Sequence, residues 1–217
     1  MNKYCNEYID LIFKKYSFLN PTIIIYGSNI YNGSSSDLDV CLILNKTDKE
    51  VENCIIKDTI KFHKVKNLKV DEEIPHTNKL IYTYDEVMET IENNPFFKNG
   101  AYKIDDIVKT KEFLSSKMMK QRLLLNILTT DHLIFGAYKK ELLNLQDKAW
   151  DLIIDTVINY FKIENLSVEN LLQHLYTNQY TGATGEMFLG YKKNYLQKEK
   201  YLRIQIEKTI ERRGLKC

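Results

Sequence analysis

Cysteine, proline, glycine and long apolar runs are all scarce in this sequence of 217 residues. With only 3 prolines and 8 glycines, the chain is neither collagen-like nor of low complexity. No apolar run approaches the ~20 residues of a membrane span, and charged residues interrupt positions 1–18, so neither a span nor a signal peptide is predicted. The 4 cysteines and 4 histidines are scattered, which predicts no zinc site and favours reduced thiols in a cytoplasmic protein.

Charge is unevenly distributed along the chain, although the net charge is only +2. Residues 1–110 contain 14 lysines and no arginine against 17 acidic residues, whereas residues 111–217 contain 17 basic residues against 12 acidic ones. An acidic half followed by a basic half suggests two functional faces, although uneven charge along a chain often has no functional meaning.

Apolar spacing predicts an α+β first half and a helical second half. The expected elements are helices over 4–18, 48–64 and 85–93, strands over 22–26, 37–44, 68–74 and 80–84, and further helices over 111–128, 131–146, 147–162, 167–177 and 191–213. Pro95, Gly100 and the change of charge place a boundary near 95–111, which gives domains over 1–110 and 111–217.

The most informative segment contains a glycine-serine turn followed by an Asp-x-Asp motif. An apolar strand ends at Gly27 and Ser28, and a short loop leads to Asp37 and Asp39 at the start of the next apolar strand. Side chains two residues apart on a strand share a face, so the two carboxylates should project together. The two carboxylates of such a pair repel each other unless a cation lies between them. Their oxygen atoms are ligands that suit Mg²⁺. Each half of the pattern also occurs as an ordinary turn or strand cap, but the combination is more specific.

This segment resembles the signature of the DNA polymerase β-like nucleotidyltransferase superfamily. The match covers about the first 110 residues, and residues 34–40 are close to the form found in standalone transferases. The resemblance implies a mixed sheet flanked by helices, followed by a helical bundle domain. It also implies transfer of a nucleoside monophosphate from an NTP, with ATP the expected donor, with release of pyrophosphate and use of two Mg²⁺ ions.

The superfamily usually has a third carboxylate on a neighbouring strand, and residues 68–74 are the expected strand here. Alternation along it places Asp71 and Glu73 on the same side, facing the aspartate pair. We expect Asp71 to be the third metal ligand beside Asp37 and Asp39, and to accept the acceptor's proton. Glu73 is the alternative, and the acidic cluster is otherwise a solvated strand end.

Phosphate binding is expected at Gly27 and Ser28, whose backbone and hydroxyl donors suit the β- and γ-phosphates. The resemblance implies that the helical domain adds positive charge, for which Lys120 and Lys192 are the candidates; Lys117, Arg122 and Lys193 are alternatives, and each is otherwise a solvated surface charge. The glycine- and tyrosine-rich residues 180–191 predict either a loop over the site or a helix connection. His132 is expected near a helix N-terminus, with a catalytic role as the alternative.

Three hypotheses remain for the partner. The first is a small hydroxylated acceptor, such as an aminoglycoside-like antibiotic or a metabolite, for which an acidic cleft would suit a cation. The second is RNA or protein, because residues 192–217 carry nine basic residues against three acidic ones. The third is a non-enzymatic interaction module that has lost catalysis. No membrane partner is predicted.

Overall fold

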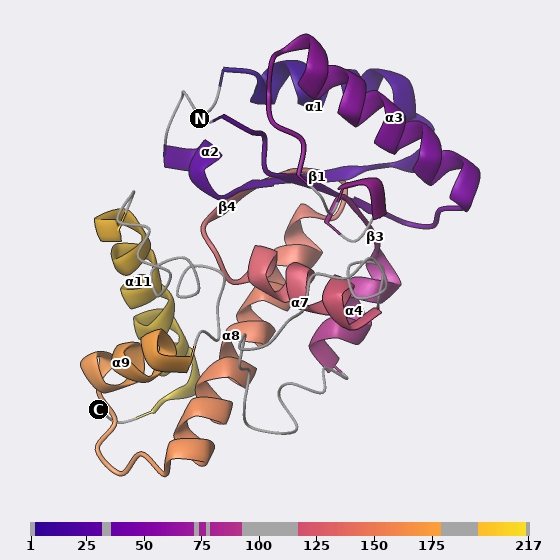
Figure 1. Ribbon diagram of the computed structural model, residues 1–217. Coiled ribbons are helices and arrows are strands. Elements are labelled where there is room, and N and C mark those ends of the chain that lie inside the picture. Colours follow the sequence, from indigo (N-terminus) through magenta and orange to yellow (C-terminus); the bar gives the residue numbers. More distant parts are fainter. Residues whose placement is uncertain are drawn as a thin grey trace.

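The computed structural model describes residues 3–31, 36–71, 74–76, 79–92, 117–178 and 195–215. Its architecture is α+β: a four-stranded mixed sheet carries helices on both faces, and the C-terminal helices pack together below it (Figure 1). The predicted α+β class and the packing of C-terminal helices are therefore confirmed. Among the helices of the described residues, none is long and apolar enough to cross a membrane.

The sheet contains four short strands in the order β3-β2-β1-β4. They are β1 (Thr22–Tyr26), β2 (Val40–Leu44), β3 (Ile81–Thr83) and β4 (His132–Gly136). β1 pairs antiparallel with both β2 and β4, whereas β2 and β3 run parallel. Every residue of β1 and β2 is buried, because helices cover both faces, and this explains their continuous apolar sequences.

Alternation along the strands divides the apolar side chains of the sheet between two cores. On one face, Ile23 and Leu42 pack in a core with α1 (Cys5–Tyr16) and α3 (Lys49–Val65). On the other, Ile24 and Ile43 pack in a core with α4 (Tyr84–Glu92), α7 (Lys117–Leu128) and α8 (Lys139–Phe161). Two short 3-10 turns, η1 (Ser17–Leu19) and η2 (Ile74–His76), lie in the connections.

The C-terminal helices α8, α9 (Val168–Asn178) and α11 (Tyr195–Arg213) share a third core around Trp150 and Leu202. Ion pairs also join them, because the arginines of α11 meet acids of α8 and α9. The pairs are Arg203 with Glu169, Arg212 with Asp147 and Asp151, and Arg213 with Asp155. Much of the positive charge that the sequence concentrates in α11 is thus neutralised within the molecule.

The prediction of a strand over residues 68–74 is wrong. Among the described residues of this segment, only an isolated bridge between Asp37 and Lys69 forms, and residues 74–76 belong to the turn η2. The place beside β2 is taken instead by β3, which pairs Ile81 with Leu42. The acids of this segment are therefore not positioned by strand alternation.

The prediction of a helix over residues 131–146 is also wrong. Residues 132–136 form β4, which completes the sheet by pairing with β1, and α8 then runs without a break through the predicted boundary at 146–147. The strand needs β1 as a hydrogen-bonding partner, and local apolar spacing contains no information about that partner. The domain boundary near 95–111 and the loop 180–191 lie outside the described residues.

Candidate functional site

The turn after β1 brings the backbone against the carboxylate of Asp39. Gly27 has a φ of +68°, in the left-handed region that favours glycine. A Cβ atom at this position would lie 2.5 Å from Asp39 Oδ2. The sequence predicts that Gly27 permits close approach of a phosphate, and the structure shows that it permits close approach of Asp39.

The short helix α2 (Ser28–Tyr31), which begins at the predicted phosphate-binding serine, makes a second contact with Asp39. The buried amide of Asn29 donates from Nδ2 to Asp39 Oδ2 at 3.1 Å. The backbone N–H of Tyr26 donates to the carbonyl oxygen of Asp39 at 3.1 Å, which extends the β1–β2 pairing by one residue. Sequence reasoning missed Asn29, although its place directly after Ser28 was a usable signal.

Lys79 joins two of the three predicted aspartates. Its Nζ donates to Asp39 Oδ1 at 3.0 Å and to Asp71 Oδ2. The ammonium also lies 5.7 Å from the centre of the Tyr26 ring, and the Lys79 side chain is only 14% exposed. Sequence reasoning missed Lys79, and no local pattern marked it, because its partners lie 8 and 40 residues away along the chain.

The electrostatics of this cluster depend on burial and on like charge. Burial raises the pKa of the Asp39 carboxyl, and Asp37 and Asp71 act in the same direction, while Lys79 opposes them. Burial by itself would lower the pKa of Lys79, but Asp39 and Asp71 together hold it above its ordinary value. Lys79 therefore remains a cation between two carboxylates.

The oxygen donors of this cluster suit a divalent cation, since Asp39 and Asp71 already converge on one positive charge. Asp37 lies near enough to Asp39 to raise its pKa. Within the described ranges, however, no group of three or more His, Cys, Asp or Glu side chains is arranged to hold a metal ion. Lys79 stands where Asp39 and Asp71 converge, so its ammonium occupies the place between these two carboxylates. The alternative acid, Glu73, lies outside the described residues.

The predicted phosphate-binding lysines are placed differently. Lys120 on α7 donates to Glu86 Oε1 at 2.6 Å and lies 5.4 Å from the centre of the Tyr82 ring. Lys117 likewise pairs with Glu89 on α4. Neither lysine contacts the aspartates in the structure, and Lys192 lies outside the described residues.

A different lysine from the C-terminal helices approaches Asp39. Lys198 on α11 is only 4% exposed. Burial lowers the pKa of its ammonium to about 8, while the nearby Asp39 acts in the opposite direction. Sequence reasoning missed Lys198 as well, yet it lies four residues before Leu202 and eight before Ile206, both buried, on the apolar stripe of its helix. A lysine on such a stripe was a usable signal.

We expect Gly27→Ala to lower the free energy of unfolding by more than Gly214→Ala does. Gly214 follows α11 with a φ of +61°, and a Cβ there would meet nothing within 4 Å. Gly214→Ala should therefore lower the free energy of unfolding only by the left-handed backbone strain, about 1 kcal/mol. Gly27→Ala adds the clash with Asp39, about 1–3 kcal/mol more. Urea denaturation of both variants measures the difference.

The same comparison in an Asp39→Ala background isolates the contact. Without the carboxylate, Gly27→Ala should cost no more than Gly214→Ala. Equal costs for the two glycine variants in the unaltered background would show that Asp39 moves aside freely, and that Gly27 does not serve to seat it.

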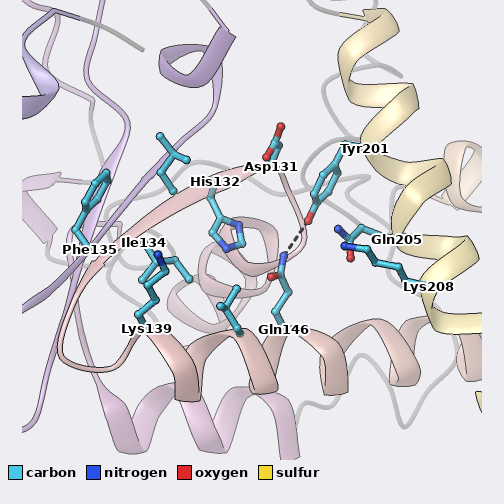
Figure 2. Close-up of a pocket in the computed structure, with 11 residues that line it drawn as sticks. Asp131, His132, Ile134, Phe135, Lys139, Gln146, Tyr201, Gln205 and Lys208 are labelled. Carbon is cyan, nitrogen blue, oxygen red and sulfur yellow. Dashed lines mark hydrogen bonds between the residues drawn. The ribbon is translucent and has the colours of Figure 1, made fainter. Parts of the chain in front are cut away.

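A pocket of about 350 Å³ lies beside this cluster, between β4, α8 and α11 (Figure 2). His132 is one of its lining residues, so the histidine lies on a strand and not at the predicted helix N-terminus. Tyr31 of α2 donates to Asp131 Oδ2 at 2.9 Å at the edge of the pocket. The pocket therefore borders α2, the helix whose Asn29 donates to Asp39.

Comparison with known proteins found no match to any protein-family model, to any curated protein or to any solved structure. The chemistry of the site therefore follows from its own residues and geometry. Those comprise the partly buried carboxylate of Asp39 seated on a glycine turn, the carboxylate of Asp71 that shares the ammonium of Lys79 with it, and the buried Lys198 on α11.

Proposed function

We propose that this protein is a nucleotidyltransferase of the DNA polymerase β-like type. It would move a nucleoside monophosphate from a magnesium-bound NTP, with ATP as the expected donor, to a hydroxyl group of a small molecule. The observation that carries the proposal is the seating of Asp39. The carboxylate packs on Gly27 and accepts a hydrogen bond from Asn29. Together with Asp71 it also contacts the ammonium of Lys79.

Each residue of the cluster has a role in the proposed reaction. Asp37, Asp39 and Asp71 would hold two Mg²⁺ ions, which when bound would neutralise charge on the phosphates. The backbone N–H groups at Gly27 and Ser28 suit the β- and γ-phosphates. Charge for the leaving pyrophosphate would come from α11, where Lys198 is the residue with an electrostatic link to Asp39.

The proposed transfer balances as a single displacement. The acceptor oxygen forms a bond to the α-phosphorus, and the bond from that phosphorus to the bridging oxygen breaks. Pyrophosphate leaves with the electron pair, and the proton of the acceptor hydroxyl passes to the carboxylate of Asp71. Lys79 must leave Asp71 before this carboxylate can accept a proton, because the ammonium now donates to it.

Incubation with each α-labelled NTP and Mg²⁺ tests the proposal directly. The acceptor panel contains small hydroxylated compounds, tRNA and the protein itself. Magnesium-dependent labelling of a small compound is the expected result. Labelling of tRNA or of the protein would move the activity to a macromolecular acceptor, and no labelling of any acceptor would contradict the proposal.

A second candidate function is an interaction module of the same fold without catalysis. One observation favours it: Lys79 already neutralises Asp39 and Asp71, so the acids form a complete ion-pair network without a metal. The two candidates differ in what happens when Lys79 is removed. A metal site should then bind Mg²⁺ more readily, whereas a structural network should simply be lost.

We expect Lys79→Met to lower the free energy of unfolding by about 3 kcal/mol in the presence of a chelator, because two partly buried carboxylates lose their partner. Magnesium should restore most of this loss, and should stabilise the variant more than it stabilises the unaltered protein. Denaturation with and without Mg²⁺ provides the measurement.

Lys117→Met is the matched control, because Lys117 also pairs with a carboxylate but is 67% exposed. Its loss should cost less than about 1 kcal/mol and should not depend on Mg²⁺. If magnesium leaves Lys79→Met as unstable as the chelator does, the acids are a structural network and the interaction module is the better description.

A pH dependence is expected from Lys198. Its folded pKa of about 8 lies below the ordinary value of 10.5, so it loses its charge as pH rises through 8. If the ammonium contacts the triphosphate, affinity for Mg-ATP should fall about tenfold between pH 7 and pH 9. The charged group that acts on the pKa of Lys198 in the structure is Asp39. Titration calorimetry at both pH values measures the change.

Lys198→Arg is the control for this pH dependence, because a guanidinium keeps its charge throughout the range. The variant should bind Mg-ATP equally at pH 7 and pH 9. The folded protein itself should become more stable between pH 8 and 10.5, since the unfolded chain binds the proton more tightly there. An identical loss of affinity in Lys198→Arg would assign the effect to another group.

A further inference from the structure

The pocket between β4, α8 and α11 is separate from the carboxylate cluster and has its own chemistry. Its volume of about 350 Å³ is that of a small-molecule site. The polar residues that line it include Asp131, His132, Lys139, Gln146, Tyr201 and Lys208. Asp37, Asp39 and Asp71 do not line it. Figure 2 shows the imidazole of His132 between Lys139 on one side and Gln146 with Tyr201 on the other.

Sheet register places this pocket next to the carboxylates. His132 on β4 is directly opposite Tyr26 on β1, and the β1–β2 register continues to place Tyr26 opposite Asp39. Directly opposed residues project to the same face of a sheet. With neighbouring strands ~4.8 Å apart, the backbones at His132 and Asp39 lie about 10 Å apart. A small molecule is long enough to reach from one to the other.

His132 presents a hydrogen-bond acceptor to the pocket. Its Nδ1 lies 2.8 Å from the carbonyl oxygen of Thr130, which only accepts, so Nδ1 carries the proton. The remaining nitrogen, Nε2, therefore holds a lone pair, and it has no partner among the described residues. Burial lowers the pKa of His132, which keeps the ring neutral at pH 7. A ligand group that meets Nε2 must be a donor, such as a hydroxyl.

The charge of the pocket favours an anion. Lys139 on α8 and Lys208 on α11 have no ion-pair partner within the described ranges, whereas Arg203, Arg212 and Arg213 on the same helix α11 are paired. Among the residues that the structure describes, Asp131 is the one carboxylate that lines the pocket, and it already accepts a hydrogen bond from Tyr31. Two lysines therefore face a ligand with little opposing negative charge.

We propose that this pocket binds the acceptor, and that the acceptor is a small hydroxylated oxoanion. Lys139 and Lys208 would hold its phosphate or carboxylate, His132 would accept from one hydroxyl, and the reacting hydroxyl would extend toward Asp39. The inference rests on the proposed nucleotidyl transfer and extends it to a substrate class. It replaces the cationic amino sugar expected from the acidic first half, because such a molecule would meet two lysines here.

Direct binding tests the assignment with a reporter that the chain supplies. Trp150 is the sole tryptophan, and its ring centre lies 6.3 Å from that of Tyr201 at the pocket. Its fluorescence should respond saturably to ribose 5-phosphate or to malate. Whichever of the two binds more tightly shows whether the pocket prefers a phosphate or a carboxylate. Ribose and kanamycin at the same concentrations should not bind. Tighter binding of kanamycin or of a single-stranded RNA than of either anion would overturn the proposal.

Lysine variants locate the binding. Lys139→Gln and Lys208→Gln should each weaken binding of the preferred anion about tenfold, the usual effect of losing one charged contact. Lys140→Gln and Lys200→Gln are matched controls, because these lysines lie on the same two helices, are exposed and do not line the pocket. Equal affinities for all four variants would overturn the proposal.

His132→Phe adds a test of the hydroxyl contact. It should reduce the preference for ribose 5-phosphate over inorganic phosphate, since inorganic phosphate lacks the sugar hydroxyls. An unchanged preference would overturn the role of Nε2.

Failure of this inference can be told from failure of the proposed function. If the unaltered protein binds the anion but does not bind Mg-ATP, nucleotidyl transfer alone would be refuted. Intact Mg-ATP binding with no response to either anion would refute the acceptor pocket alone.

Discussion

Replacing Asp39 by asparagine should reduce the rate of nucleotidyl transfer on the order of 10²–10³-fold while the protein still folds. The amide is nearly the same size as the carboxylate, so the space above Gly27 stays filled. It carries no charge, however, and is a poorer ligand for Mg²⁺ than a carboxylate. The measurement is kcat/KM with α-labelled ATP and the acceptor identified in the panel.

Asparagine is a sharper substitution than alanine at this position. Alanine would leave Asn29 and Lys79 without the carboxylate that both now contact, and would lower stability for reasons unrelated to catalysis. Even asparagine should lower the free energy of unfolding by about 1–3 kcal/mol, because Lys79 loses a charged partner.

Asp58→Asn is the matched control for Asp39→Asn. Asp58 is also a paired aspartate, bonded to Lys15 and Tyr16, and its helix α3 covers the opposite face of the sheet. Its loss should affect stability but leave the transfer rate within about twofold, the scatter expected of a residue outside the site. Equal rates for Asp39→Asn and Asp58→Asn would remove Asp39 from the catalytic machinery.

The sequence was sufficient to predict features that depend on neighbouring residues. The apolar runs that end at Tyr26 and begin at Val40 identify β1 and β2, because both strands are buried on both faces. Gly27 and Asp39 are adjacent to these runs, so the motif and the strands were found together. The structure adds that the two residues contact each other.

Features that depend on distant partners could not be predicted in the same way. Lys79 matters because folding brings it to Asp39 and Asp71, and no spacing in the sequence records this meeting. The strand β4 is similar: only Ile134 in it is buried, so it shows no alternation, and pairing with β1 decides its conformation. Tertiary hydrogen bonding outweighed local propensity there.

Charge counted along the sequence also differs from charge displayed on the surface. By composition, residues 192–217 suit an RNA backbone, with nine basic residues against three acidic ones. In the structure, Arg203, Arg212 and Arg213 are paired with acids of α8 and α9, and Lys198 is buried. Pairing within the molecule leaves less free charge for phosphates, which favours the small acceptor over RNA.

Asp71→Asn should separate nucleotide binding from turnover. Asp37 and Asp39 remain to hold the ion that accompanies the nucleotide, so affinity for Mg-ATP should change little. Turnover should fall on the order of 10²–10⁴-fold, because a neutral amide cannot take the proton of the acceptor hydroxyl. Calorimetry gives the affinity, and single-turnover transfer of label gives the rate.

Contact, and not strand alternation, now favours Asp71 over Glu73. The described residues 68–71 form no strand, so alternation no longer places both acids on one side. Lys79, by contrast, links Asp71 to Asp39 directly. Glu73→Gln is therefore the control and should keep nearly full turnover. An inactive Glu73→Gln beside an active Asp71→Asn would transfer the role to Glu73. If both variants turn over normally, the proton acceptor lies outside this segment, and Lys79 holds Asp71 for structural reasons alone.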